Sequence, residues 1–94
     1  MVDNDPPVNV QPSLPLGHAH RGFCGRIQAI HVGEGVSDLP GNELENRLIE
    51  LGFVEGASVK ILHEGPFSGD PIAVRVNNAT IALRRREAMA ILVI

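Results

Sequence analysis

The sequence is poor in aromatic residues and cysteine, and each shortage excludes a class of protein. Its 94 residues include three Phe, no Tyr and no Trp, which excludes a broad aromatic platform for stacking nucleotide bases. Cys24 is the single cysteine, so an internal disulfide is excluded and a reducing compartment is favoured.

Long hydrophobic runs are also missing. No apolar stretch approaches the roughly 20 residues that a membrane-spanning helix needs. The first residues, MVDNDPPVNVQPS, lack the basic and apolar regions of a signal peptide. We therefore expect a soluble, cytoplasmic protein without direct membrane insertion.

Positive charge is in short supply, with 8 Lys and Arg against 11 Asp and Glu and a formal net charge of −3. Nucleic-acid binders usually need a net basic face to displace counterions from phosphates, so this balance argues against a nucleic-acid partner. Apolar residues, in contrast, make up 44% of the chain, which suits the core of one small globular domain.

The chain divides into two parts by composition. Residues 1–13 contain three prolines among acidic residues and Asn, so we expect a disordered N-terminal tail. From Leu14 onward the sequence is apolar and punctuated by Gly. Residues 14–94 are therefore predicted to form one domain.

Five short segments have the composition of strands, namely 25–32, 58–64, 72–76, 80–83 and 90–94. In the first of them Ile27 and Ile30 fall on opposite faces of a regular strand, which either a β-bulge or burial of both faces would explain. An open sheet of this size leaves bare edges. We therefore expect a mainly β fold, a small closed barrel of about five strands with one or two short helices.

Asn77 and Asn78 predict a hairpin with a two-residue turn, because Asn tolerates the positive φ that such turns require. This turn places the apolar residues of both strands on one face. The register that follows pairs Val74 with Ile81, Ile72 with Leu83, and Arg75 with Thr80.

The stretch NELENRLIEL, residues 42–51, predicts one amphipathic helix, because its three leucines fall on one face. Asn42 can cap this helix while Glu45 bonds back to the N–H of the cap. At the other end, Gly52 can adopt the left-handed conformation that ends a helix, and Phe53 then packs on Leu48.

Three stretches in fixed order resemble the FeoA family of small cytoplasmic proteins of bacterial ferrous iron transport. They are RLIELGFVEGASVKIL, GPFSGDPIAVRV and IALRRREAMAILV, and the resemblance covers about residues 14–94. It implies an SH3-like β-barrel, an accessory and non-catalytic role, and a partner, the FeoB ferrous iron permease with its cytosolic GTP-binding part. The loop PFSGDP is one residue longer than the compact form expected of the family.

The candidate partner-binding residues are Arg47, Phe67, Arg84, Arg85 and Arg86. An aromatic ring on a loop is unusual in a chain with so few, and Phe67 can therefore anchor a partner. The three consecutive arginines can meet an acidic surface on the permease, which would make the association salt-sensitive.

Plainer explanations exist for each candidate. Arg47 can form an exposed ion pair with Glu43, and one of the three arginines can pair with Glu87. Asp70, which precedes Pro71, can start a turn with its side chain bonded to nearby backbone. An apolar edge formed by Leu48, Leu51, Phe53 and Val54 can face a partner, but core packing is the simpler assignment.

His18, His20 and Cys24 lie close together in the sequence and are residue types that bind transition metals. Their spacing matches no established zinc pattern, so no metal site and no cofactor are assigned. No catalytic set is recognised either, since Cys24 lacks an obvious partner base. Two hypotheses remain: a non-catalytic module that contacts FeoB and modulates iron uptake, or a transition-metal-binding or metal-responsive regulatory domain.

Overall fold

The computed structural model describes residues 13–33 and 41–94, so the predicted tail lies outside the described residues apart from Ser13. Within these ranges no helix is both long enough and apolar enough to cross a membrane. The elements in chain order are β1 (Leu14–Pro15), a 3₁₀ turn (Leu16–His18), β2 (Cys24–Ile30), α1 (Gly41–Glu50), β3 (Ser58–Gly65), β4 (Gly69–Val76), β5 (Ala79–Leu83), α2 (Arg85–Ala88) and β6 (Ile91–Val93).

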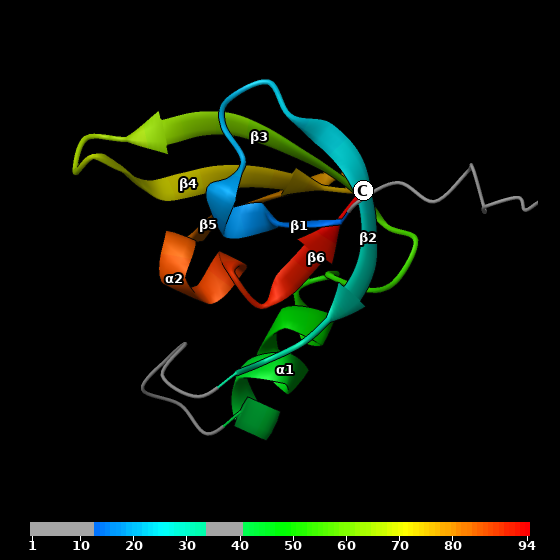
Figure 1. The fold of residues 1–94 in the computed structure, drawn as a ribbon. Coiled ribbons are helices and arrows are strands. Elements are labelled where there is room, and N and C mark those ends of the chain that lie inside the picture. The colour runs from blue at the N-terminus through cyan, green and yellow to red at the C-terminus, as the bar shows by residue number, and fades with distance from the viewer. Residues whose placement is uncertain (1–12, 34–40) are drawn as a thin grey trace, which may run out of the picture.

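The strands form one antiparallel sheet in the order β1-β6-β2-β3-β4-β5. The sheet curls, so that β1 and β6 lie across the core from β3 and β4 (Figure 1). This confirms the prediction of a mainly β, SH3-like fold with short helices. The sheet has six strands where about five were predicted; the additional one is β1, whose two residues are too few to carry an alternating pattern.

The expected closure of the barrel is also corrected. In the described part of the chain the sheet runs from β1 to β5 without a ladder that joins these two strands. The edges are instead kept short, with 2 residues in β1 and 5 in β5, which limits the unpaired backbone that they expose.

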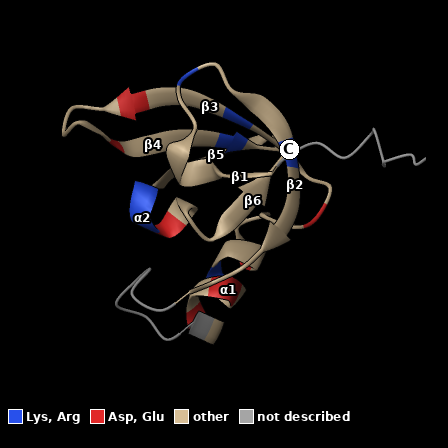
Figure 2. Cartoon of the chain, viewed as in Figure 1, with Lys and Arg blue, Asp and Glu red and all other residues tan. Residues whose placement is uncertain are grey.

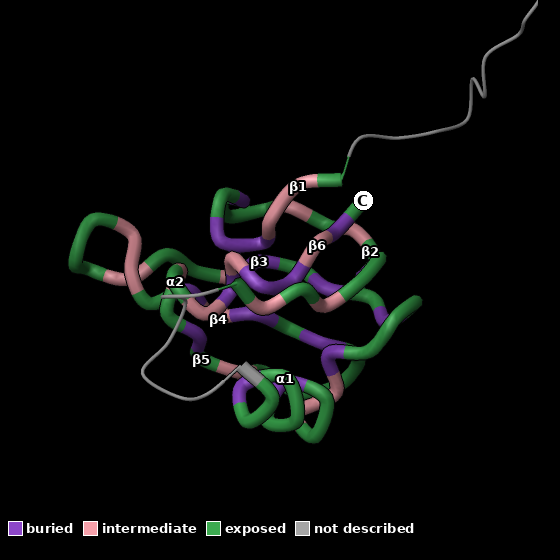
Figure 3. The backbone as a smooth tube through the Cα atoms, turned by 60° about the horizontal axis from the view of Figure 1, so that its bottom comes forward, coloured by how far each residue is buried: buried purple, intermediate pink, exposed green. Residues whose placement is uncertain are grey.

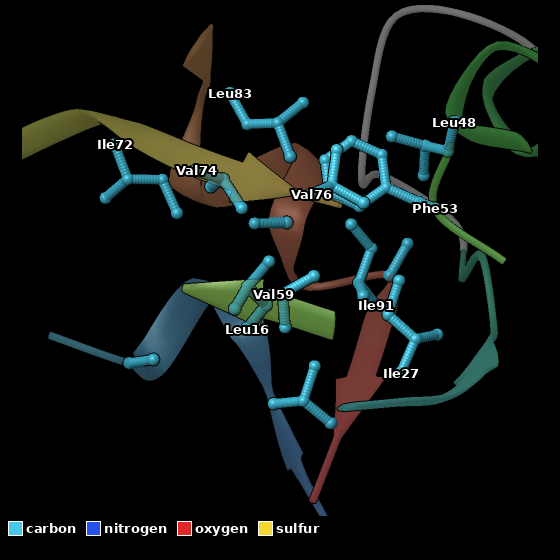
Figure 4. Close-up of a cluster of buried hydrophobic side chains, with 14 of the residues drawn as sticks. Leu16, Ile27, Leu48, Phe53, Val59, Ile72, Val74, Val76, Leu83 and Ile91 are labelled. Atoms are coloured by element: carbon cyan, nitrogen blue, oxygen red, sulfur yellow. The ribbon is translucent and has the colours of Figure 1, made fainter. Parts of the chain in front are cut away.

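Side chains from both ends of the curled sheet and from α1 fill one core (Figure 4). Buried and exposed residues alternate along β3 and β4, as expected for strands with one face on the core (Figure 3). The largest fully buried side chains are Phe53, Leu16, Ile27, Leu44, Leu48, Ile61, Ile72, Leu83, Ile91, Val74, Val76 and Val93.

Of the two explanations for Ile27 and Ile30, the structure shows the bulge in β2. Ile27 pairs with Val93 and Ala29 pairs with the next residue back, Leu92, so β2 carries one extra residue at this point. Ile27 is therefore buried while Ile30, two pairs along, still packs against the core. The strand itself ends at Ile30 rather than at residue 32.

Helix α1 begins at Gly41, one residue earlier than predicted. Asn42 therefore lies inside the first turn and is not the capping residue, so that prediction is wrong. Side-chain chemistry locates a helix start only to within a residue or two. The buried face is as predicted, since Leu44 and Leu48 are both fully buried.

The predicted end of α1 is confirmed. Gly52 has a φ of 106° and donates its N–H to the carbonyl of Ile49 at 3.0 Å, while Phe53 donates to Leu48 at 2.9 Å. These are the two hydrogen bonds of a Schellman motif. Phe53 lies beside Leu48 in the core (Figure 4) and directs the chain from α1 towards β3.

The hairpin of β4 and β5 has the predicted register in all three pairs. Asn77 has a φ of 53°, as the turn requires. However, β4 begins at Gly69 rather than at residue 72, so the Gly and Pro loop is largely part of a longer β3–β4 hairpin.

Candidate protein-interaction surface

Phe67 lies at the tip of the β3–β4 hairpin, which projects from the body of the domain (Figure 1). Gly65 pairs with Gly69, and the backbones of Phe67 and Asp70 exchange hydrogen bonds of 3.3 and 3.2 Å. Ser68 turns the chain with a φ of 57°. The ring of Phe67 is 78% exposed, the most exposed of the large hydrophobic side chains in the described ranges.

A hollow of about 310 Å³ adjoins this ring. It is lined by Phe67, Asp70, Pro71 and Arg84, which places an aromatic ring, a proline and a guanidinium around one depression. Two of the five predicted contact residues, Phe67 and Arg84, are thus brought together although 17 positions separate them (84 − 67). We call this region the Phe67 surface.

Asp70 connects the hairpin to α2. Its carboxylate accepts a hydrogen bond of 2.8 Å from the backbone N–H of Arg85, the first residue of that helix. The sequence suggested a bond to nearby backbone, whereas the observed donor is 15 residues away. This bond satisfies one of the unpaired N–H groups at a helix start.

Arg85 is turned inward and holds the hairpin against the segment after β1. Its guanidinium donates to the carbonyls of Gly69 at 3.0 Å, Gly17 at 3.0 Å and Ala19 at 2.7 Å. It also contacts the carboxylate of Glu64 at 2.5 Å, and only 19% of its side chain is exposed. The basic cluster is therefore divided, with Arg84 and Arg86 exposed and Arg85 used inside the domain.

Glu64 accepts contacts from three donors near the tip of the β3–β4 hairpin, one residue before Gly65. Its carboxylate accepts the backbone N–H of Arg21 at 3.0 Å, lies 3.2 Å from Nδ1 of His20, and contacts Arg85. The hydrogen bond from Arg21 comes first among the causes that lower the pKa of Glu64, followed by that from His20. Slight burial opposes this shift, and the charges of His20 and Arg85 reinforce it.

The predicted metal-ligand types do not converge. His18 and His20 line a hollow of about 440 Å³ with Glu64 and Arg85, but Cys24 lies elsewhere, on β2. In residues 13–33 and 41–94 there is no group of three or more His, Cys, Asp or Glu placed to hold a metal ion.

Arg47 pairs with Glu87 at 3.6 Å and not with Glu43, so the predicted ion pair is corrected. The other oxygen of the Glu87 carboxylate accepts the backbone N–H of Arg84 at 3.4 Å. Glu87 thereby joins α1 to the start of α2. A spacing of four residues on a helix favours the Glu43 pair, but tertiary packing supplies a closer carboxylate.

The apolar edge that the sequence suggested is mostly core. Leu48 and Phe53 are fully buried and Leu51 is half-buried, so core packing accounts for them. Val54 is 41% exposed and is the one member at the surface.

The model of the FeoA domain matches residues 14–94, which is nearly the whole described chain. The chain belongs to the FeoA family. This membership implies a role in ferrous iron transport, and the family is one of small accessory domains. Curated protein sequences include no match to this chain.

Solved FeoA structures have the same fold as this FeoA chain. Iron(II) transport protein A from Clostridium thermocellum is 34% identical over 85% of this chain and 44% of its own, with a TM-score of 0.69. The FeoA protein from Chlorobium tepidum is 30% identical over 85% of this chain and 68% of its own, also with a TM-score of 0.69.

A third similar structure is that of Stenotrophomonas maltophilia FeoA complexed with zinc, which is described as a prokaryotic SH3 domain protein. It is 26% identical over 89% of this FeoA chain and 91% of its own, with a TM-score of 0.68. The SH3-like assignment of the fold rests on this likeness together with the curled antiparallel sheet.

Three acidic residues that organise this FeoA domain were not recognised as such from the sequence. Glu64, Asp70 and Glu87 each bond across elements, to donors 15 or more residues away. One local signal existed for Glu87, because a Glu three residues after Arg84 suits the first turn of a helix. Nothing local marks the partners of the other two.

Proposed function

We propose that this FeoA chain is a cytoplasmic, non-catalytic accessory protein that contacts the FeoB ferrous iron permease and modulates iron uptake. The proposal takes the role in ferrous iron transport from the family. It adds a contact surface, the Phe67 surface, on the β3–β4 hairpin. The partner in this proposal is the cytosolic GTP-binding part of the permease.

The observation that carries the proposal is the exposed ring of Phe67 beside its hollow. Burying one phenyl ring in a partner contributes about 2 kcal/mol or more, which is the scale of a binding hot spot. The ring is also presented rigidly, because Asp70 and Arg85 fasten the hairpin to α2 and to the carbonyls of Gly17 and Ala19. A preorganised loop loses less entropy on binding.

The arginines have two roles in this proposal. Arg84 lines the hollow of the Phe67 surface, Arg86 is exposed on α2, and Arg47 is 54% exposed on α1. We propose that these three meet acidic groups of the permease. Arg85 positions the hairpin. Complementary charge would mainly raise the association rate. High salt would screen these charges and reduce the rate again.

Modulation requires that the chain bind one state of the permease better than another, since a ligand with equal affinity for both states shifts neither. The test is capture of FeoB from detergent-solubilised membranes on the immobilised protein, with a GTP analogue, with GDP and without nucleotide. We expect recovery in one nucleotide state, and loss of recovery with Phe67→Ala.

Ile94→Ala is the matched control. Ile94 is also an exposed hydrophobic residue, at 41%, but it follows β6 and is not part of the Phe67 surface. Capture of FeoB that is equal for wild type, Phe67→Ala and Ile94→Ala would remove Phe67 from the contact. Failure to capture FeoB in any nucleotide state would remove the proposal itself.

The metal-responsive alternative has weaker support. His18, His20 and Glu64 line one hollow, and the Stenotrophomonas maltophilia FeoA structure contains zinc. However, the Glu64 carboxylate already accepts hydrogen bonds from Arg85 and Arg21. Only two histidines then remain to bind a metal, so the interaction module is the proposal that we prefer.

A further inference from the structure

A second surface, on the outer face of β2, β3 and β4, concentrates positive charge. A hollow of about 330 Å³ there is lined by Arg26, Lys60 and Arg75, together with Cys24, Ser58 and Asn77, all of them exposed. We call it the basic hollow. Its lining contains no Asp or Glu, although acidic residues outnumber basic ones in the chain as a whole, 11 to 8.

The sheet register brings these cations together. Lys60 of β3 lies directly opposite Arg75 of β4 on one side and opposite Cys24 of β2 on the other. Residues that are direct partners across a ladder share a face, and the face here is the outer one because Val59 and Val74 beside them are buried. Basic segments of β3 and β4 lie side by side in Figure 2.

This arrangement is unfavourable for the domain by itself. Like charges directly opposite each other in a ladder repel and destabilise the pair. In the described residues neither Lys60 nor Arg75 has a carboxylate within ion-pair distance. The guanidinium of Arg26 donates to the neutral carbonyl of Gly56 at 3.2 Å, while its backbone N–H donates to an oxygen of Ile94 at 2.9 Å. Three cations on the outer face therefore have no carboxylate partner among the described residues, whereas the inward-facing Arg85 contacts Glu64.

We propose that the basic hollow binds an acidic, carboxylate-bearing segment of a partner protein. Arginine forks match carboxylates in two-point hydrogen bonds, and Lys60 adds a point charge between them. A small anion is disfavoured, because ligand pockets enclose most of their ligand whereas these side chains are all exposed. Nucleic acid is disfavoured, because the lining has no aromatic ring on which bases stack.

The basic hollow is separate from the Phe67 surface. Lys60 and Gly65 lie five residues apart along β3, which corresponds to about 17 Å of strand. The inference therefore does not depend on the proposed contact through Phe67. A partner long enough to reach both surfaces would gain affinity from the second contact.

The test is binding of a synthetic Glu-rich peptide at low salt, with the same peptide carrying Gln in place of Glu as its control. Binding is followed by shifts of backbone amide resonances and by the rate at which iodoacetamide alkylates Cys24. Because Cys24 is the single cysteine and lines the basic hollow, its protection reports occupancy of that site.

We expect the Glu-rich peptide, and not the Gln peptide, to slow alkylation of Cys24 and to shift amides of β2, β3 and β4. Lys60→Gln with Arg75→Gln should weaken this binding by about tenfold, the effect of losing two charge contacts. Arg21→Gln removes one charge from an exposed side chain outside the linings of the basic hollow and the Phe67 surface, and it should leave the affinity within about twofold.

Three results would overturn the proposal. The first is that the Glu-rich peptide does not bind the wild-type protein, and the second is that Arg21→Gln loses as much affinity as the Lys60 and Arg75 double variant. The third is that inorganic triphosphate or single-stranded RNA protects Cys24 while the peptide does not. The first two results would show that the basic hollow does not bind acidic segments. The third would show that it binds a different class of ligand.

Discussion

The guanidinium of Arg85 contacts the carboxylate of Glu64 at 2.5 Å, which joins α2 to β3 across 21 residues of sequence. The same side chain donates to the carbonyls of Gly17, Ala19 and Gly69. Arg85 thus connects α2 with the β3–β4 hairpin and with the segment after β1. The orientation of the Phe67 surface depends on these contacts.

Arg85→Ala should destabilise the protein by about 2 kcal/mol, because it leaves part-buried carbonyls without their donor and removes one of the three donors to the Glu64 carboxylate. Arg84→Ala, which removes an exposed guanidinium next to it, should change the free energy of unfolding by less than about 0.5 kcal/mol. Urea denaturation measures both. Equal midpoints for the two variants would mean that the Arg85 contacts contribute nothing to stability.

The contribution of Glu64 to stability should depend on pH. Its pKa in the folded protein is below the ordinary value of 4.5, so the unfolded state takes up the proton first as pH falls. The stabilisation is therefore complete above about pH 4.5 and is lost as pH falls through the folded-state pKa.

Glu64→Gln tests this dependence, because Gln keeps the shape of the side chain without its charge. The difference in unfolding free energy between wild type and Glu64→Gln should be largest near neutral pH and should shrink below about pH 4.5. Thermal denaturation across this range measures it. A difference that does not vary with pH would contradict the assigned hydrogen bonds.

Gly52→Ala should cost about 1–2 kcal/mol, because the φ of 106° lies in a region that residues with a Cβ avoid. Space is not the cause, since an added Cβ would meet the nearest Val76 methyl at an ordinary 3.8 Å. Gly52→Asn should cost less, because Asn tolerates the left-handed conformation better. Equal losses in chemical denaturation would point to a steric cause instead.

Lys60→Glu should stabilise the protein by about 0.5 kcal/mol, because it turns a like-charge pair with Arg75 into an attractive one. Thermal denaturation at low salt should show the gain, and added salt should reduce it. Lys60→Gln, which only removes the repulsion, should give a smaller gain. A loss of stability on Lys60→Glu would show that the repulsion between Lys60 and Arg75 is negligible.

Wild-type protein should bind Fe²⁺ or Mn²⁺ only weakly, because Arg85 and Arg21 already occupy the carboxylate beside His18 and His20. Isothermal titration under anaerobic conditions measures the affinity. Sub-micromolar binding that disappears in a His18→Ala, His20→Ala double variant would favour the metal-responsive function over the interaction module.

Local sequence determined the features whose partners lie within a few residues. Gly52 and Phe53 specify the end of α1, because the left-handed conformation and the apolar contact involve one turn of chain. Asn77 and Asn78 specify the register from Ile72 to Leu83, because a two-residue turn permits only one pairing. The family motifs are built on these same segments, which is why the family and the SH3-like fold were predictable.

Only the tertiary structure decided which charges are used internally. Arg84, Arg85 and Arg86 are chemically equivalent in the sequence, yet Arg85 alone donates to Gly17, Ala19 and Gly69. These acceptors become neighbours only when the curled sheet brings β1 and the β3–β4 hairpin together. Likewise, Lys60 and Arg75 gather at the basic hollow through strand pairing, because charge patterning along one strand carries no information about the strand beside it.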